Sequence, residues 1–168
     1  MAAAPAVSAS ENTSGSAFKA LAPGPLSHDA AAALFPGTVF FAGQVAPVQT
    51  RNVAGAKLPG GLVLAGVVDT SGYSSGVQER YQAYLLLDTP TLFGGRLLQP
   101  GAYGCGVVGS EFLVLDLSAK LLFSVAAQHD GELKRPVPLQ VLAEAGAYRL
   151  YLGRSFVSFA PGHADTAQ

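Results

Sequence analysis

The sequence predicts an all-β fold, an antiparallel β-sandwich or barrel of about nine or ten strands. Short apolar runs follow one another at roughly the 8–12-residue spacing of such folds, with short connections between them. Glycine (20) and proline (11) are abundant, which favours strands joined by tight turns over long helices. No long helical pattern separates the runs, so a parallel βαβ fold is not expected.

The composition excludes some classes of protein. Of the 168 residues, 49% are apolar, so the chain is not intrinsically disordered. The net charge is −1 and the ten Lys and Arg residues are scattered, so we expect no nucleic-acid partner. Only 12% of the residues are charged. The surface is therefore either polar but uncharged, or covered by self-association.

The chain divides into three parts. Residues 1–26 form an Ala/Ser/Pro-rich arm that we expect to be flexible, because it has few large side chains to bury. Residues 27–160 form a single β domain, and residues 161–168 a loose polar tail. Phe18 and Leu21 are the arm's candidate anchors, should it order against a neighbouring subunit.

The N-terminal composition bears on localisation. No apolar stretch reaches the roughly 18–20 residues of a transmembrane segment. Residues 2–10 lack the basic region and apolar core of a signal peptide, but have the small-residue composition often found after a cleavage site. We therefore expect an extracytoplasmic protein, periplasmic or secreted, in mature form with Met1 added for expression.

One short helix is predicted at residues 27–37, before the first strand. Ser27 can cap its free amides, and Asp29 suits the positive end of the helix dipole. Four alanines continue the helix, and Pro36 with Gly37 ends it.

The strands follow in order, with a turn signal after each. Residues 62–68 are apolar at every position, which predicts burial on both faces. Gly109 and Ser110 predict a two-residue hairpin turn. Short apolar runs lie at 92–93 and 96–98. The expected strands are residues 38–42, 45–53, 62–68, 81–87, 102–108, 111–117, 121–128, 137–143, 147–152 and 155–159.

The strand 102–108 carries the only cysteine and two glycines. Cys105 cannot form an intrachain disulfide, and we interpret it as a small buried hydrophobe rather than a reactive thiol. Gly104 and Gly106 share one face of the strand. They either let the sheet curve, which we favour, or leave room for a large neighbour such as Tyr84 or Phe112.

The polar loop 69–80, between two apolar strands, is the main candidate site. Ser, Gly, Tyr and Gln make adaptable hydrogen bonds around a rigid aromatic side chain, as in many binding loops. Tyr73 is the residue least explained by packing, so we expect it to contact a ligand. The candidate binding residues are Asp69, Ser71, Tyr73, Ser74, Gln78 and Glu79.

Catalysis is not expected from this loop. Its serines need a histidine base, and the only histidine in the middle of the domain is His129. In a simple up-and-down meander, His129 falls at the end of the sheet opposite the loop. There is also no GxSxG elbow, so a small hydrolase is a distant third hypothesis.

The two carboxylates that flank the loop have competing interpretations. Asp69 and Glu79 could serve glycoside cleavage or bind calcium. We favour Asp69 as a turn cap, with Glu79 paired to Arg80 or Arg51 at the surface. The histidines lie in separate segments, so we expect no metal site and no cofactor.

A second polar segment, residues 129–136, carries His129, Asp130 and Arg135. It is either a solvated turn with local ion pairs or a secondary binding surface, pH-sensitive through His129. The first hypothesis is a non-enzymatic exported module that binds a protein partner, a peptide or a glycan through the loop 69–80. The alternative is a structural subunit that self-associates, as a homo-oligomer, through sheet edges or the N-terminal arm.

Overall fold

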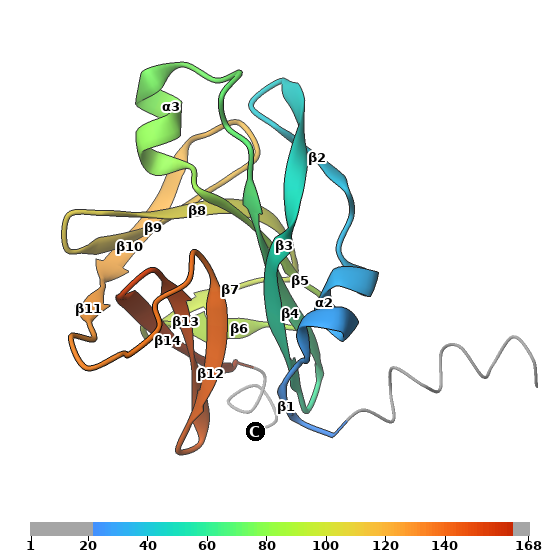
Figure 1. Ribbon diagram of the computed structural model, residues 1–168, viewed down its shortest axis with the longest axis vertical. Helices are drawn as coiled ribbons and strands as arrows, with labels where there is room; N and C mark the ends of the chain where they lie inside the picture. The colour runs from blue at the N-terminus through green and yellow to red at the C-terminus, as the bar shows by residue number, and fades with distance from the viewer. Residues whose placement is uncertain (1–21, 163–168) are drawn as a thin grey trace, which may run out of the picture.

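The computed structural model describes residues 22–162 and shows two antiparallel sheets packed face to face (Figure 1). The prediction of an all-β fold, an antiparallel sandwich or barrel, is therefore confirmed, and the sandwich is the form observed. The described part of the chain holds fourteen strands, four of them only two or three residues long, and two short helices. Expectations for residues 1–21 and 163–168, most of the arm and the tail, lie outside the described residues.

The larger sheet has eight strands. In spatial order it comprises β1 (Gly24–Pro25), β3 (Gln44–Leu58), β4 (Gly61–Val68), β5 (Ala83–Leu87), β8 (Gly101–Val108), β9 (Glu111–Leu115) and β10 (Leu121–Ala126), while β2 (Thr38–Phe41) pairs with the start of β3. The hairpin between β8 and β9 turns at Gly109 and Ser110, as predicted, because Val108 pairs with Glu111.

The smaller sheet has six strands. In order it comprises β12 (Gln140–Glu144), β13 (Ala147–Leu152), β14 (Ser155–Pro161), β6 (Thr91–Phe93) and β7 (Arg96–Leu98), while β11 (Gln128–His129) pairs with the start of β14.

The expected simple meander is wrong. After β5 the chain crosses to the smaller sheet as β6 and β7, then returns as β8 beside β5. The physical reason is burial: β6 pairs with β14, which places Phe93 beside Phe159 in the sandwich core. Three-residue strands gain little alone, so they form where a longer strand supports them.

The central strands of the larger sheet are buried on both faces, which gives the molecule two cores. Val63 and Ala65 of β4 point into the sandwich core between the sheets. Leu64 and Val68 point into a second core on the outer face of the same sheet. The prediction that residues 62–68 are buried on both faces is confirmed. Burial of the outer face means that other segments of the chain cover this side of the larger sheet.

That cover consists of helix α2 (His28–Leu34), strand β2 and the segment 69–81 with its helix α3 (Ser75–Arg80). Helix α2 begins as predicted, since the Ser27 hydroxyl accepts a hydrogen bond from the Ala30 amide at 3.1 Å. Helix α3 was not expected, because the segment 69–80 was interpreted as a loop. Neither helix in residues 22–162 is long and apolar enough to cross a membrane.

Two boundaries differ from the expected ones. Strand β1 lies inside the predicted arm 1–26 and pairs with β3, and the Leu26 amide donates to the Gly55 carbonyl at 2.9 Å. Strand β14 runs on to Pro161, and the Gly162 amide donates to the Pro90 carbonyl at 3.0 Å. Backbone pairing extends the ordered part past both boundaries, since these strand ends add little side-chain burial of their own.

The glycine expectation for β8 is also corrected. A Cβ on Gly104 would lie 2.5 Å from the Phe41 ring and 2.9 Å from the Tyr81 ring, so Gly104 makes room for two stacked aromatic side chains. Cys105 on the other face is fully buried, as predicted, and burial raises the pKa of its thiol from 9.0 to about 12.

Candidate functional site

Tyr73, the expected contact residue of the segment 69–80, is buried in the second core. Its hydroxyl donates to the Phe41 carbonyl at 2.8 Å, and its ring meets the Phe41 and Tyr81 rings edge-on. Tyr73 is therefore a packed core residue. The expectation that its role lies outside core packing is wrong. The cause is the β2–β3 hairpin, which folds over the same face of the sheet.

The other predicted residues of this segment mostly hold it together. The Ser71 amide donates to the Asp69 carboxylate at 3.1 Å, and hydrogen bonds from Ser71 hold the pKa of Asp69 below its ordinary value. This confirms Asp69 as a turn cap. Ser74 caps α3 by accepting from the Val77 amide, and Gln78 donates to the Tyr73 carbonyl at 2.8 Å. Most of the polar groups expected to meet a ligand are thus engaged within the segment.

Glu79 is exposed and makes no ion pair within residues 22–162, so its expected pairing with Arg80 or Arg51 is wrong. Arg80 instead donates to the Ala119 carbonyl at 3.2 Å, because α3 lies against the turn after β9. A contact role for the exposed Ser71, Ser74 and Glu79 stays a prediction.

The second predicted surface, residues 129–136, is tied to the smaller sheet. The Asp130 carboxylate accepts from the Tyr151 hydroxyl at 2.7 Å and lies 3.8 Å from the Arg149 guanidinium. The Tyr151 hydrogen bond, helped by the Arg149 charge, holds the pKa of Asp130 below its ordinary value. Arg154 donates to the carbonyls of Asp130 and Leu133.

The ion pairs of this segment are therefore long-range, and the expectation of local ion pairs is wrong. Arg149 also pairs with Glu144 at 3.2 Å and stacks over the Phe156 ring at 4.2 Å. His129 and Arg135 are exposed. His129 belongs to β11 in the smaller sheet, whereas the segment 69–81, which holds the serines, packs on the outer face of the larger sheet through Tyr73 and Tyr81.

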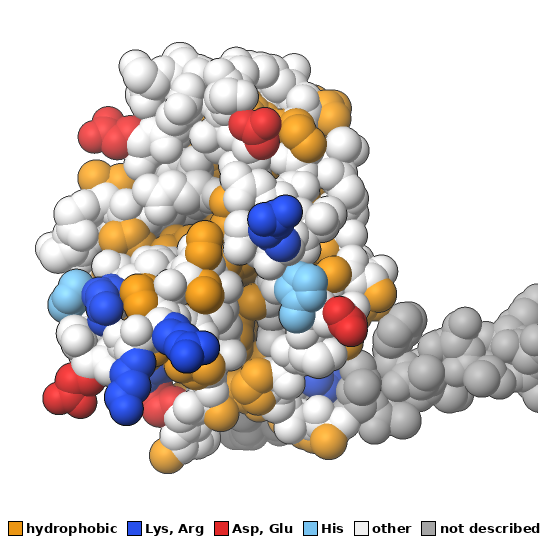
Figure 2. Space-filling view, in the orientation of Figure 1, with side chains coloured by type: hydrophobic (Ala, Val, Ile, Leu, Met, Phe, Trp, Pro, Cys, Tyr) orange, Lys and Arg blue, Asp and Glu red, His pale blue; other side chains and the backbone are white. Residues whose placement is uncertain are grey.

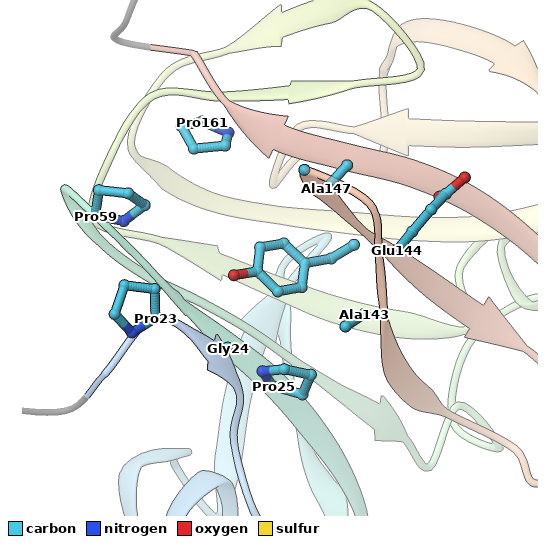
Figure 3. A pocket seen from close by; sticks show the side chains of 10 residues that line it. Pro23, Gly24, Pro25, Pro59, Ala143, Glu144, Ala147 and Pro161 are labelled. Carbon is cyan, nitrogen blue, oxygen red and sulfur yellow. The ribbon is translucent and has the colours of Figure 1, made fainter.

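Two cavities lie away from both predicted surfaces, where β1 and β3 of the larger sheet face β12 of the smaller sheet. We call the region that holds them the seam groove. The lower cavity has a volume of about 390 Å³. Figure 3 shows Pro23, Pro25 and Pro59 along one wall, with Ala143 and Ala147 across from them. The full lining is Pro23, Gly24, Pro25, Pro59, Ala143, Glu144, Gly146, Ala147, Tyr148 and Pro161.

The lower cavity presents no free charge. Glu144 is its one acidic lining residue, and its side chain points away from the hollow (Figure 3) toward its ion pair with Arg149. The prolines have no amide hydrogen to offer, and the ring of Tyr148 is held in place by stacking on Phe159 at 5.5 Å. The walls are thus apolar and rigid.

The upper cavity, of about 270 Å³, has a different character. Arg51 and His28 contribute basic groups, and Gln140 contributes an amide. Figure 2 shows a basic side chain beside a histidine on this face, next to a strip of hydrophobic side chains. The full lining is Leu26, His28, Arg51, Asn52, Val53, Ala54, Val137, Pro138, Leu139, Gln140 and Val141.

The seam is bordered by a bulge in β3 on one side and by the unpaired edge of β12 on the other. The pairing of β3 with β4 shifts register between Val48 and Val53, so residues 49–52 bulge from the sheet. His28 Nε2 lies 3.2 Å from the Thr50 carbonyl, which fixes the bulge against α2. On the other side, β12 is the edge of its sheet, and within residues 22–162 no strand pairs with its outer edge.

Sequence reasoning missed this groove. Its walls come from residues 23–28, 51–59 and 137–148 with Pro161, which only the folded chain brings together. The local signal is proline near strand ends, at Pro23, Pro25, Pro59, Pro138 and Pro161.

Comparisons with protein-family models, with curated proteins and with solved structures find no match for this chain. Among residues 22–162, no group of three His, Cys, Asp or Glu side chains is placed to hold a metal ion. The function is therefore inferred from the geometry of the groove.

Proposed function

We propose that this protein is a non-enzymatic module that binds an extended peptide segment of a partner protein in the seam groove. The observation that carries the proposal is the pair of cavities beside the unpaired edge of β12. A peptide strand added to a sheet edge gains affinity from main-chain hydrogen bonds and specificity from pockets for its side chains. The seam groove offers both elements.

The dimensions suit a short peptide. Gln140 lines the upper cavity and Ala143 the lower one, and both belong to β12. Three residues of strand span about 10 Å, so an extended peptide of about five residues reaches both cavities. The rigid proline walls favour binding, because little side-chain freedom is lost when the peptide docks.

A peptide fits the groove better than a glycan does. Sugar rings are held on exposed aromatic faces, and among Phe, Tyr and Trp only Tyr148 is in the linings of the two cavities. Its ring already stacks on Phe159. The predominantly aliphatic and proline lining matches small apolar side chains instead.

The test is selection of binding peptides from a random ten-residue display library, followed by amide NMR mapping of the selected peptides on the protein. We expect shifts at residues 140–148 and 23–26. Ala143→Trp fills the lower cavity and should weaken binding at least roughly tenfold. Ala126→Trp, at an exposed alanine on the edge strand β10, is the matched control and should leave binding unchanged.

Selected peptides that map to residues 69–80 and ignore Ala143→Trp would contradict the groove and support the original loop hypothesis. If the library yields no binding peptide, the peptide-binding function itself is wrong.

Self-association is the second candidate. Pro23 and Pro25 line the lower cavity, and the sequence before them contains the apolar residues Phe18 and Leu21. Two copies that exchange this segment would each fill the other's groove. Exposed apolar side chains elsewhere offer further contacts: Phe40 and Val45 on the β2–β3 hairpin, and Leu121 and Leu122 on β10.

Light scattering of the full chain and of a variant lacking residues 1–21 separates these possibilities. A dimer that depends on residues 1–21 supports segment exchange, and a dimer that survives the deletion supports the sheet edges. A concentration-independent monomer in both proteins excludes self-association.

We also propose that the protein is exported, which the small-residue composition of residues 2–10 supports. Cell fractionation of the natural gene product tests this, and recovery in the cytoplasmic fraction alone would contradict it.

A further inference from the structure

The upper cavity of the seam groove is rich in hydrogen-bond donors and poor in acids. Arg51 and His28 line it, and no Asp or Glu does. Arg51 forms no ion pair within residues 22–162. The nearest acid to His28 is Asp29, 3.6 Å away and fully exposed outside the cavity. Arg51 is also exposed, so its positive charge is open to an anionic group of a ligand.

A second donor belongs to the same cavity lining, on β12. Gln140 Nε2 is buried and has no acceptor in the structure. Buried donors are nearly always satisfied, so an orphaned amide in a cavity wall needs a physical account. The Gln140 side chain as a whole is only partly buried, and its terminal torsion is soft, so a small rotation turns the amide toward an incoming acceptor.

The donors come from opposite walls, Arg51 from β3 and Gln140 from β12. A carboxylate has two oxygens in one plane, and a guanidinium matches them with two parallel N–H groups. A ligand carboxylate would thus supply both the counterion that Arg51 lacks and the acceptor that Gln140 lacks. A neutral amide would supply an acceptor but no charge.

We propose that the upper cavity is a carboxylate-binding subsite in which Arg51 and Gln140 hold an acidic group of the bound peptide. The inference rests on the proposed function, since it names the chemistry of the peptide that the seam groove takes. The carboxylate has two possible sources, an Asp or Glu side chain and a peptide C-terminus.

The experiment uses the full chain and three synthetic pentapeptides, titrated by NMR while the Gln140 side-chain amide signals are followed. The first is Ac-Pro-Ala-Ala-Glu-Ala-amide, and the second is the same peptide with Gln in place of Glu. The third is the Gln peptide with a free C-terminus. We expect one of the two acids to bind roughly tenfold more tightly than the neutral peptide and to move the Gln140 signals. The acid that binds more tightly identifies the source.

Substitutions then test the two donors. Arg51→Gln should remove the preference for the acid, and Arg51→Lys should keep only part of it, because lysine lacks the planar fork. Lys120→Gln is the control: it removes an exposed positive charge in the turn before β10, outside the linings of both cavities, and should change nothing. Added salt should weaken the acid preference, since Arg51 is exposed and its charge is screened by ions.

Gln140→Met separates a binding role from a structural one. Methionine keeps the volume but removes the unsatisfied donor, so the urea midpoint should stay unchanged or rise while affinity for the acidic peptide falls. A purely structural glutamine would lose stability and affinity together, which would overturn its assigned role.

The outcomes distinguish the two levels of the proposal. If the acidic and neutral peptides bind the groove equally, the subsite is wrong and the peptide-binding function stands. If none of the three peptides shifts groove residues and the display library also yields no binder, both are wrong. A preference for the acid that survives Arg51→Gln also overturns the subsite.

Discussion

Two neighbouring tyrosines in the second core should respond in opposite ways to the loss of a hydroxyl. The Tyr73 hydroxyl donates to the buried Phe41 carbonyl at 2.8 Å. The Tyr81 hydroxyl is buried and has no partner in the structure, although its ring stacks on Phe41 with centroids 3.7 Å apart. Substitution by phenylalanine preserves each ring and removes only the hydroxyl.

The expected magnitudes follow from the cost of hydrogen bonds in protein interiors. Tyr73→Phe removes one hydrogen bond and leaves a buried carbonyl short of a donor, which should lower the free energy of unfolding by about 1–2 kcal/mol. Tyr81→Phe removes a desolvated group that gains nothing in return, which should raise it by up to about 1 kcal/mol. The two variants should therefore differ by about 1–3 kcal/mol. For a chain of this size that corresponds to roughly 2–12 °C in Tm.

Urea and thermal unfolding, followed by circular dichroism, measure the difference directly. The native near-ultraviolet spectrum should persist in both variants, since each core ring remains in place. A Tyr81→Phe variant destabilised as much as Tyr73→Phe would refute the reasoning, because it would mean that the Tyr81 hydroxyl has a partner such as an internal water.

Three further predictions concern a glycine, a carboxylate and the thiol. Gly104→Ala should lower the free energy of unfolding by about 1–3 kcal/mol, because the new methyl group meets two stacked rings. Gly76→Ala, in α3 with open space around it, should raise the free energy of unfolding by about 0.5–1 kcal/mol. Equal effects of the two substitutions in urea unfolding would contradict this. Hydrogen bonding lowers the pKa of Asp130, so the contribution of this carboxylate to stability is present above the unfolded pKa near 3.8 and is lost as the pH falls. The urea midpoint of Asp130→Asn should therefore change less between pH 7 and pH 3 than that of the native protein. Burial raises the pKa of Cys105 from 9.0 to about 12, so the contribution of the neutral thiol to stability should be fully present below pH 9 and be lost as the pH rises above it. A thiol reagent should label Cys105 at neutral pH only after unfolding. Labelling of the native protein would be the contrary result.

The parts that the sequence predicted correctly depend on residues close together in the chain. The cap at Ser27, the hairpin turn at Gly109 and the turn at Asp69 each involve backbone groups a few residues away. Their chemistry is the same wherever the segment lies. Burial of residues 62–68 on both faces could also be predicted, because an apolar side chain at every position leaves no face for solvent.

The parts that were missed depend on distant segments. Tyr73 looked unexplained because nothing near it in the sequence shows that the β2–β3 hairpin covers the same face of the sheet. Helix α3 was missed because it has six residues and a glycine within it, although Ser74 is a typical cap. The seam groove was missed because Arg51 and Gln140 lie on strands of different sheets. No local pattern encodes that pairing.

The crossing of β6 and β7 into the smaller sheet has a consequence for biosynthesis. Phe93 on β6 pairs with Phe159 on β14, so these short strands leave the ribosome long before their supporting strand does. The strands of the larger sheet are all complete by Ala126, and its sandwich face stays bare until β12, β13 and β14 follow. During that interval the nascent chain exposes a broad apolar surface, a state in which chains aggregate or recruit chaperones. A ribosome that stalls between residues 126 and 155 would therefore release a fragment with half of its sandwich core open to solvent.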